Sequence, residues 1–395
     1  MASRRLAAAP SIDALRDIAR RRVPRMAFDY MDGGAETEQG LARNRSAFGN
    51  VTLTPRYFTD VSGRTSEVEL LGRGYAAPIG IAPTGLAGLV WPGADAALAL
   101  AAKEHRLPFV LSTPATLTIE AAATLAPGLV WFQLYVMNDR AITEDLLRRA
   151  HAAGIEVIVV TVDIPVPAKR ERDIRNGFTL PLRPSLKMAW DVATHPAWAL
   201  AMLRHGTPQF ANLAPYAAAK STSTRSLAAF MASQISSAVT WDVIDWIRSV
   251  WPGYMLVKGV LSAADATAAL DHRVDGIVVS NHGGRQFDAA PASIEALPAI
   301  VAAVAGRMPV LLDSGIRRGL DVAKAMALGA DFTFVGRATL YGAGAGGDAG
   351  VKRAMDILLG ELIASLGQLG CTCVDHFRKV EWQTLRLLQP NKNDQ

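Results

Sequence analysis

Short apolar runs separated by helix-like segments constrain the fold of this chain more than any other feature. The intervening stretches are rich in Ala and Leu, as in "GLDVAKAMALGA". The eight runs are "PIGIAPT" (78–84), "FVLST" (109–113), "VWFQLYV" (130–136), "VIVVTVD" (157–163), "YMLVKG" (254–259), "GIVVSN" (276–281), "PVLLDSG" (309–315) and "FTFVGR" (332–337). Uninterrupted apolar strands that alternate with helices are typical of a parallel sheet covered by helices. Eight such units predict an α/β fold of the TIM type, a (β/α)8 barrel.

The length of 395 residues suits one such barrel with additions. We expect a single domain over 1–395, with the barrel at about 78–370 and an N-terminal helical cap before it. The spacing of the runs fails once, between Asp163 and Tyr254, which predicts a long insertion after the fourth strand at about 180–235. The segment "GAGAGG" (342–347) matches a dinucleotide-binding pattern, but no strand follows the next helix, so we interpret it as a glycine-rich linker.

Composition and charge narrow the class of protein. Half of the residues are hydrophobic, so a large core can form, and the net charge is only 41 − 36 = +5. No dense Lys/Arg stripe with aromatic residues occurs, so nucleic acid is not an expected partner. The opening "MASRRLAAAP" lacks the apolar segment of a signal peptide, and prolines and glycines interrupt the uncharged stretch 75–94. We therefore expect a cytoplasmic chain without a transmembrane helix.

Few residues suggest a metal site or a disulfide. The two cysteines, Cys371 and Cys373, lie close together in "GCTCVDH", followed by His376. Two cysteines exclude a disulfide framework, and one histidine beside them is a poor set of metal ligands. No metal is expected.

The insertion combines aromatic, apolar and basic residues. They are Trp190, Trp198, Leu200, Met202 and Leu203, with Lys187, Arg204, Lys220 and Arg225. This combination suits a membrane interface or a partner surface. A lid or a contact between subunits fits it equally well, because long loops in compact domains are usually functional.

Polar side chains occur where the predicted strands end, which is where barrel enzymes place their catalytic groups. The set comprises Thr84, Ser112, Gln133, Tyr135, Thr161, Asp163, Lys258, Ser280, His282, Arg285, Asp313, Arg317 and Arg337. Taken singly, a Ser or Thr at a strand end also fits a turn or a helix cap. Polar groups at all eight ends favour a site. Gly315 and Gly336, with Arg317 and Arg337, follow the last two strands, where barrels commonly bind a phosphate.

The stretch "SNHGGRQFD" (280–288) suggests particular chemistry. His282 is a candidate general base because a neutral imidazole titrates near working pH. Arg285, and Arg170 in "KRERD", could each hold a carboxylate through two hydrogen bonds. Asp163 either caps the next segment or orients the histidine. Lys258 suits a Schiff base, the stabilisation of developing negative charge, or an ion pair.

Together these motifs resemble the FMN-dependent L-2-hydroxy acid oxidases and dehydrogenases. The resemblance covers about residues 12–370 and rests on "APTG", "FVLST", "WFQLYV", "TVD", "RERD", "LVKG", "SNHGGRQFD", "DSGIRRG" and "VGR", in family order. It implies FMN as the cofactor. It implies flavin contacts at Ala82, Pro83, Thr84, Ser112, Gln133, Thr161, Lys258 and Ser280, and phosphate contacts at Asp313, Gly315, Arg317, Gly336 and Arg337.

The resemblance also assigns roles around the substrate. His282 would take a proton from a 2-hydroxy acid while Asp163 supports it, and Lys258 would stabilise the reduced flavin. Arg170 and Arg285 would bind the substrate carboxylate, and Tyr30 and Tyr135 would donate hydrogen bonds to the substrate. The family resemblance further suggests a homotetramer.

Within the family, "HPAWALAMLRHGTPQFANL" looks like the corresponding segment of the membrane-associated (S)-mandelate dehydrogenases. Gly85 points the same way, because glycine leaves room for an aromatic side chain above the flavin. We therefore expect oxidation of (S)-mandelate or a similar aryl acid, with quinone as acceptor and peripheral contact with the inner face of the cell membrane. Oxidation of L-lactate, or an oxidase that uses O2, is the nearest alternative. A sugar-phosphate aldolase or isomerase with Lys258 as Schiff base, or an inactive scaffold, is the alternative from another class.

Overall fold

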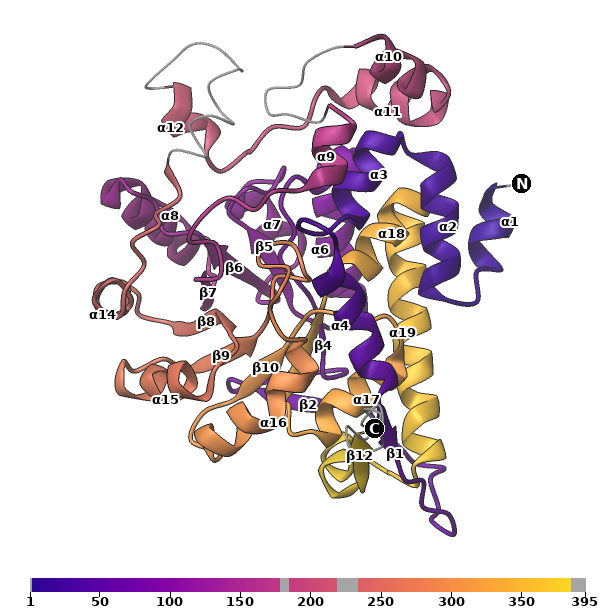
Figure 1. The fold of residues 1–395 in the computed structure, drawn as a ribbon, viewed down its shortest axis with the longest axis vertical. Coiled ribbons are helices and arrows are strands. Elements are labelled where there is room, and N and C mark those ends of the chain that lie inside the picture. Colours follow the sequence, from indigo (N-terminus) through magenta and orange to yellow (C-terminus); the bar gives the residue numbers. More distant parts are fainter. Residues whose placement is uncertain (1, 178–184, 219–233, 385–395) are drawn as a thin grey trace, which may run out of the picture.

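Eight parallel strands close into a barrel, as the apolar runs predict (Figure 1). The computed structural model describes residues 2–177, 185–218 and 234–384. Around the barrel the strand order is β10-β11-β4-β5-β6-β7-β8-β9. The strands are β4 (Ile79–Ile81), β5 (Phe109–Ser112), β6 (Val130–Leu134), β7 (Val157–Thr161), β8 (Tyr254–Val260), β9 (Gly276–Val279), β10 (Val310–Leu312) and β11 (Phe332–Val335). Each begins and ends within a few residues of its predicted run.

Helices cover the outside of the barrel. They include α6 (Ala94–His105), α7 (Ile119–Leu125), α8 (Arg140–Ala152), α14 (Trp241–Val250), α15 (Ala263–Asp271), α16 (Ser293–Val304), α17 (Gly319–Ala327) and α19 (Asp348–Gln368). Several begin at a side-chain cap, as where Thr118, Asp139 and Ser262 accept backbone N–H groups. Strands packed on both faces have no polar side, which explains the continuous apolar runs.

The barrel interior is filled by large side chains rather than left open. Trp131, Leu256, Phe332 and Phe334 are among the residues buried there. A hairpin of β2 (Val68–Leu70) and β3 (Arg73–Tyr75) adds to this cluster, because the Tyr75 ring packs edge-on against Phe332 with centroids 5.6 Å apart. Phe332 begins its strand, so the hairpin covers the end of the barrel opposite the strand ends that carry the polar residues.

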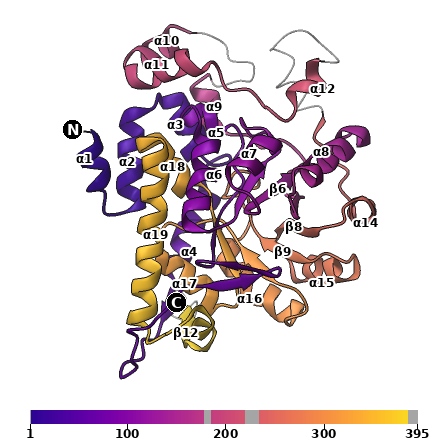
Figure 2. The same cartoon turned by 180° about the vertical axis from the view of Figure 1, so that it is seen from behind.

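The N-terminal cap consists of α1 (Ala2–Ala7), α2 (Ile12–Arg22), α3 (Arg25–Asp32) and α4 (Gln39–Gly49). These helices lie along one side of the barrel, beside α19 and α18 (Arg337–Gly346), as Figures 1 and 2 show from opposite sides. A short strand β1 (Val51–Leu53) pairs with β12 (Trp382–Thr384), which follows the 3-10 helix Val374–Lys379. The predicted helical cap is therefore present.

The linker interpretation of "GAGAGG" is wrong. Most of the segment belongs to α18, which is buried from Arg337 to Ala345. A Cβ built on Gly342 would overlap the backbone of Gly350 in α19, and one on Gly344 would lie 3.0 Å from Ala19 Cβ in α2. The glycines let three helices approach closely, which a pattern of spacing alone does not distinguish from a loop.

The loop after β7 forms α9 (Glu171–Arg175), and the insertion that follows forms α10 (Leu186–Ala193), α11 (Pro196–His205) and α12 (Ala214–Ala218). In both Figure 1 and Figure 2, α10 and α11 project beyond α9 and α3 at one end of the molecule. Residues 178–184 and 219–233, which include Lys220 and Arg225, lie outside the described residues.

The structure divides the aromatic residues of the insertion into two kinds. Trp190 is exposed, whereas Trp198 is buried and donates from its indole nitrogen to Leu89 O at 3.1 Å. Trp198 therefore anchors α11 to the barrel and is not part of an exposed surface. No described helix is long and apolar enough to cross a membrane, and the stretch 75–94 is divided among β3, β4 and α5 (Ala87–Val90).

Candidate active site

A cavity of about 420 Å³ opens at the carboxyl ends of the strands. Fifteen residues singled out from the sequence line it, namely Tyr30, Ala82, Pro83, Thr84, Gly85, Tyr135, Arg170, Lys258, His282, Arg285, Asp313, Gly315, Arg317, Gly336 and Arg337. The other five, Ser112, Gln133, Thr161, Asp163 and Ser280, do not line it. They lie on the same strand ends or directly after them, where they contact one another or the lining residues.

The turn after β9 explains its glycines. His282, Gly283 and Gly284 all have left-handed backbone conformations, with φ of 56°, 68° and 70°. A Cβ on Gly284 would lie 2.5 Å from Leu41 N, and one on Gly283 would lie 2.7 Å from an Arg337 nitrogen. Ser280 Oγ accepts the His282 backbone N–H at 3.0 Å and holds the turn. The tight turn therefore directs the imidazole into the cavity.

His282 is set up as a neutral base. Its Nδ1 lies 2.9 Å from Asp163 Oδ1, so a neutral imidazole donates from Nδ1 and leaves the lone pair of Nε2 free for a proton. Burial lowers the pKa of His282 below its ordinary value, and this outweighs the opposing effect of Asp163. Asp163 acts as the orienting partner, which was one of its two interpretations from sequence.

Lys258 lies beside Asp163, the partner of His282, and its side chain is buried, with only 4% of the residue exposed. Its Nζ donates to Ser280 Oγ at 2.7 Å and lies 3.6 Å from Asp163 Oδ2 and 3.4 Å from Asp313 Oδ2. Burial alone would lower the pKa of Lys258, but the two carboxylates outweigh it and raise the pKa. A lysine that forms a Schiff base must lose its proton, so this environment disfavours the aldolase alternative.

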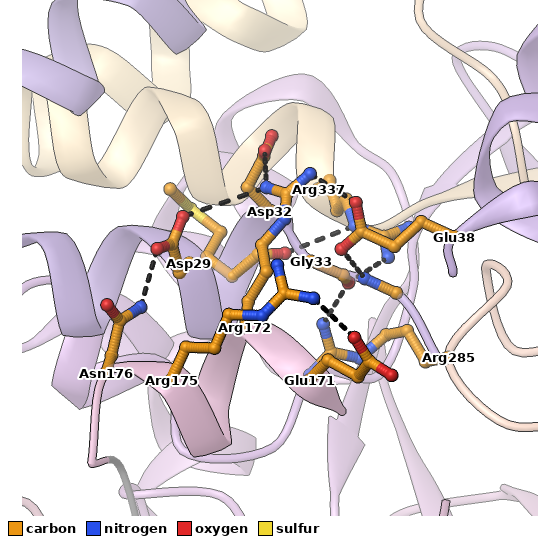
Figure 3. Close-up of polar contacts among 12 residues, drawn as sticks. Asp29, Asp32, Gly33, Glu38, Glu171, Arg172, Arg175, Asn176, Arg285 and Arg337 are labelled. Carbon is orange, nitrogen blue, oxygen red and sulfur yellow. Dashed lines mark hydrogen bonds and ion pairs between the residues drawn. The ribbon is translucent and has the colours of Figure 1, made fainter. Parts of the chain in front are cut away.

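Three arginines converge on one side of the cavity. Arg285 donates to the Tyr30 carbonyl at 2.8 Å. The Gly33 carbonyl accepts from Arg285 at 2.9 Å and from Arg337 at 2.8 Å (Figure 3). Burial and the charges of Arg170 and Arg337 lower the pKa of Arg285 to about 9. The lowered pKa means that the positive charge of Arg285 is buried beside other cations without enough negative charge to balance it. A bound anion, such as a substrate carboxylate, would supply that negative charge.

Arg170 completes this group with less support from the protein. Its guanidinium lies 6.0 Å from the Tyr30 ring centre, and its nearest carboxylate, Asp173, is 3.9 Å away. Arg170 Nε finds no hydrogen-bonding partner among the residues that the structure describes. The Tyr30 hydroxyl donates to Gly85 O at 3.2 Å, on the floor of the same region.

Polar groups at the strand ends, in the lining of the cavity and directly behind it, fit the FMN that the resemblance implies. Thr84 Oγ1, Gln133 Nε2 and Thr161 Oγ1 are buried without hydrogen-bonding partners in the described part of the chain. Orphaned polar atoms in a row are costly unless a ligand satisfies them, and a flavin ring has donors and acceptors along its edge. Gly315, at φ 98°, and the N-terminus of α18 at Gly336 supply backbone N–H groups for a phosphate.

Arg317 and Arg337, which follow the last two strands of the barrel, differ in what their guanidinium groups contact. Arg337 uses its guanidinium on the carbonyls of Met31, Gly33 and Gly283, so its side chain supports the N-terminal cap while its backbone begins α18. Arg317 donates to Ile316 O at 2.7 Å. It therefore remains the better source of a side-chain contact with a phosphate.

A set of apolar side chains that sequence reasoning missed also lines the cavity and forms an apolar wall. It includes Pro114, Ile164, Val166, Phe210 and Ile235. Phe210 lies within the insertion, and Ile235 lies at its C-terminal end. The sequence pattern around Phe210 and Ile235 does not indicate that they line a cavity. This role could have been suggested only by the fact that the insertion must return to the strand ends.

Backbone pairing fixes the insertion beside the cavity at two places, near Ala211 and at Ile235. Ala211 N donates to Ala115 O at 3.0 Å, and buried Asn212 accepts Ile119 N at 2.9 Å. On the other side, Ile235 bridges to Met137, and Ser236 N donates to Val136 O at 2.9 Å. The loops after β5 and β6 thus hold Phe210 and Ile235 in place.

Comparisons with known proteins agree with this geometry. The model of the FMN-dependent dehydrogenase family matches residues 19–383. (S)-Mandelate dehydrogenase of Pseudomonas putida is 41% identical over 91% of this chain and 90% of its own length. A putative L-lactate dehydrogenase of Mycobacterium tuberculosis is also 41% identical, over 98% of this chain and 92% of its length. The crystal structure of a monotopic membrane protein, (S)-mandelate dehydrogenase, superposes with a TM-score of 0.90 at 40% identity and covers 94% of this chain and 99% of that one.

Proposed function

The chain belongs to the FMN-dependent dehydrogenase family and oxidises 2-hydroxy acids with FMN, and we propose that its substrate is (S)-mandelate or a similar aryl acid. The product is the corresponding 2-keto acid, and the electrons pass to a membrane quinone. The observation that carries the aryl assignment is the composition of the cavity, where Arg170 and Arg285 and the apolar side chains of Phe210 and Ile235 line the same space. A substrate with a carboxylate at one end and an aromatic ring at the other suits both kinds of lining.

The side chains of this protein have separable tasks in that reaction. Arg170 and Arg285 hold the carboxylate, and Tyr30 and Tyr135 orient the substrate between them. His282 accepts a proton at Nε2 while Asp163 stabilises the imidazolium that forms. Ala82 to Thr84, the polar groups behind them and the loops after β10 and β11 would hold FMN, which when bound would supply a two-electron acceptor. Lys258 keeps its positive charge beside the flavin site.

Gly85 contributes to the space for the aryl group. A Cβ at this position would lie 2.9 Å from Pro114 Cγ, so any larger residue must displace the loop after β5 or enter the cavity. The Tyr30 hydroxyl already contacts the Gly85 carbonyl. Glycine therefore keeps this corner of the cavity open.

Anaerobic bleaching of the bound flavin tests the proposal. Mandelate should reduce the flavin faster than lactate or glycolate does. L-Lactate is the second candidate because a putative L-lactate dehydrogenase is as similar in sequence as the mandelate enzyme. Faster bleaching by lactate would replace the aryl assignment. Reoxidation by a quinone but not by O2 would support a dehydrogenase, and rapid reoxidation by O2 would indicate an oxidase.

We further propose that α10 and α11 contact the cytoplasmic face of the membrane. Leu186, Trp190 and Leu203 are 93%, 74% and 83% exposed, and basic Lys187 and Arg204 lie beside them. Apolar and basic residues on one projecting surface suit an anionic lipid interface. Sedimentation with anionic vesicles should carry the wild-type protein down, and Trp190→Ser with Leu203→Ser should remain in the supernatant. A tetramer, the other expectation from the resemblance, is tested by the mass of the purified protein in solution.

A further inference from the structure

The cap turn, residues 29–38, joins α3 to α4 and contacts both sides of the carboxylate site. Its carbonyls at Tyr30 and Gly33 hold Arg285, while Ala35 N donates to Gly284 O at 2.9 Å. Glu36 N donates to Lys169 O at 2.8 Å, directly before Arg170. In the proposed function, Arg170 and Arg285 bind the substrate carboxylate. They follow different strands, and the cap turn contacts both of their segments, so it fixes the position of one relative to the other.

Arg172 is the side chain that ties the segment of Arg170 to this turn. From α9 it donates to Asp32 Oδ2 at 2.8 Å, and its other terminal nitrogen donates to Glu38 (Figure 3). Asp29 Oδ1 lies 3.7 Å away. Arg172 itself does not line the cavity. One guanidinium thus neutralises carboxylates on both sides of the turn while the residue two positions earlier faces the substrate.

The carboxylates that Arg172 contacts are already organised by other groups. Asp32 accepts two hydrogen bonds from Arg16, at 2.6 and 2.8 Å, and one from the Tyr341 hydroxyl at 2.7 Å. Although burial alone would raise it, the pKa of Asp32 lies well below its ordinary value because of Arg16, Tyr341 and Arg172. Glu38 Oε1 accepts Gly34 N at 2.9 Å. Asp32 is therefore ionised, and hydrogen bonds fix both carboxylates on the segment whose carbonyls at Tyr30 and Gly33 hold Arg285.

We propose that Arg172 is a positioning residue, which holds the cap turn against α9 and prevents its carboxylates from attracting Arg170 and Arg285 away from the substrate. This inference rests on the proposed function, because it concerns the same carboxylate site. Asp173 lies within the electrostatic influence of both the cap-turn carboxylates and the two arginines. Burial raises the pKa of Asp173, and the charges of Asp29 and Glu38 raise it further. The charges of Arg170 and Arg285 oppose this rise. Without Arg172, Asp32 keeps its ion pair with Arg16, but Glu38 loses the guanidinium that pairs with it. Negative charge is then left uncompensated beside a site built to receive an anion.

Arg172→Met tests this role, and Arg175→Met is the matched control. Arg175 lies on the same short helix but is exposed and pairs only with Glu171 among the contacts described for it. The readout is the change in bound-flavin absorbance on titration with phenylglyoxylate, an aryl 2-oxo acid, and with its methyl ester, which lacks the charge. We expect the acid-to-ester ratio of affinities to fall about 10- to 100-fold in Arg172→Met, with FMN content unchanged. Arg175→Met should keep the wild-type ratio.

Two further variants distinguish positioning from general loosening of the fold. Arg172→Lys keeps one charge but lacks the planar guanidinium that places separate nitrogens on Asp32 and Glu38, so its ratio should be intermediate. Adding Glu38→Gln to Arg172→Met removes an unmasked charge while an amide oxygen can still accept Gly34 N–H, so part of the ratio should return. Equal weakening of acid and ester in Arg172→Met, or a ratio that stays at the wild-type value, would overturn the inference alone. A wild-type protein whose flavin responds to neither ligand would remove the proposed function and this inference with it.

Discussion

The two walls of the cavity have different origins. The polar wall is built from strand ends of the barrel and from the turn after β9, and its groups are fixed by short contacts such as Lys258 to Ser280 and His282 to Asp163. The apolar wall depends on Phe210 and Ile235, which belong to an insertion anchored at Ala211 and at Ile235. In the proposed function, the barrel therefore supplies the chemistry, and the insertion contributes to the choice of substrate side chain.

The largest effect should follow from changing the base on the polar wall. His282→Ala should slow anaerobic reduction of the flavin by about 10²- to 10⁴-fold, because general base catalysis contributes that much. FMN content should stay at the wild-type level, since the imidazole is assigned to the substrate. Stopped-flow absorbance measures both quantities, and a rate within a few-fold of wild type would remove His282 from the mechanism.

Removal of the buried lysine should affect stability as well as activity. Lys258→Met leaves Asp163 and Asp313 buried with less positive charge beside them, and breaking a buried ion pair in this way costs about 3–5 kcal/mol of unfolding free energy. Urea unfolding of the FMN-loaded protein measures the loss. Lys103→Met, on the exposed face of α6, should leave the unfolding midpoint unchanged; an equal loss there would show that the ion pairs are not the cause.

The pH dependence of the reaction should have a defined sign. Because burial lowers the pKa of His282 in the folded protein, the neutral base is present at pH 7 and is lost only when the pH falls through that lowered pKa. We expect kcat/KM to be constant above about pH 6.5 and to decrease about tenfold for each further pH unit below the lowered pKa. A decrease that begins above pH 7 would contradict the environment described for His282.

The smallest of these effects should come from the apolar wall, and it should depend on the substrate. Phe210→Leu shortens the wall without opening a large void, so kcat/KM for mandelate should fall about tenfold relative to that for lactate. Phe287→Leu is the control, because Phe287 is exposed and does not line the cavity. Equal losses for the two substrates would mean that Phe210 supports the fold and does not select the side chain.

The same division explains how far the sequence could be interpreted. Strand ends are visible because a continuous apolar run must be buried on both faces, so the polar residue that follows it, such as Asp163 or Lys258, stands at a predictable place. "SNHGGRQFD" adds two glycines, Gly283 and Gly284, and both have left-handed conformations in the structure. The barrel, the helical cap and the lining positions of most candidate residues followed from these local rules.

Other features depend on long-range packing that leaves no local pattern. Gly342 reads as a loop residue until α19 is known to lie against it. Phe210 reaches the cavity because the loop after β5 pairs with Ala211, and Ile235 reaches it because the segment after β6 pairs with Ile235 and Ser236. Trp198 and Trp190 look alike in sequence, but one finds the carbonyl of Leu89 and the other remains exposed.

The dependence of Arg285 on the carbonyls of the cap turn has a consequence for the order in which the protein matures. Tyr30 and Arg285 are separated by 255 residues, so a growing chain emerges from the ribosome with its N-terminal helices long before the arginine is made. Domains fold during synthesis as their parts become available. Here the N-terminal cap turn can make its contact with Arg285 only after the ninth strand, β9, and the loop that follows it have been synthesised. Incomplete chains therefore cannot assemble the anion site, and oxidation of hydroxy acids begins only when nearly the whole polypeptide has been made.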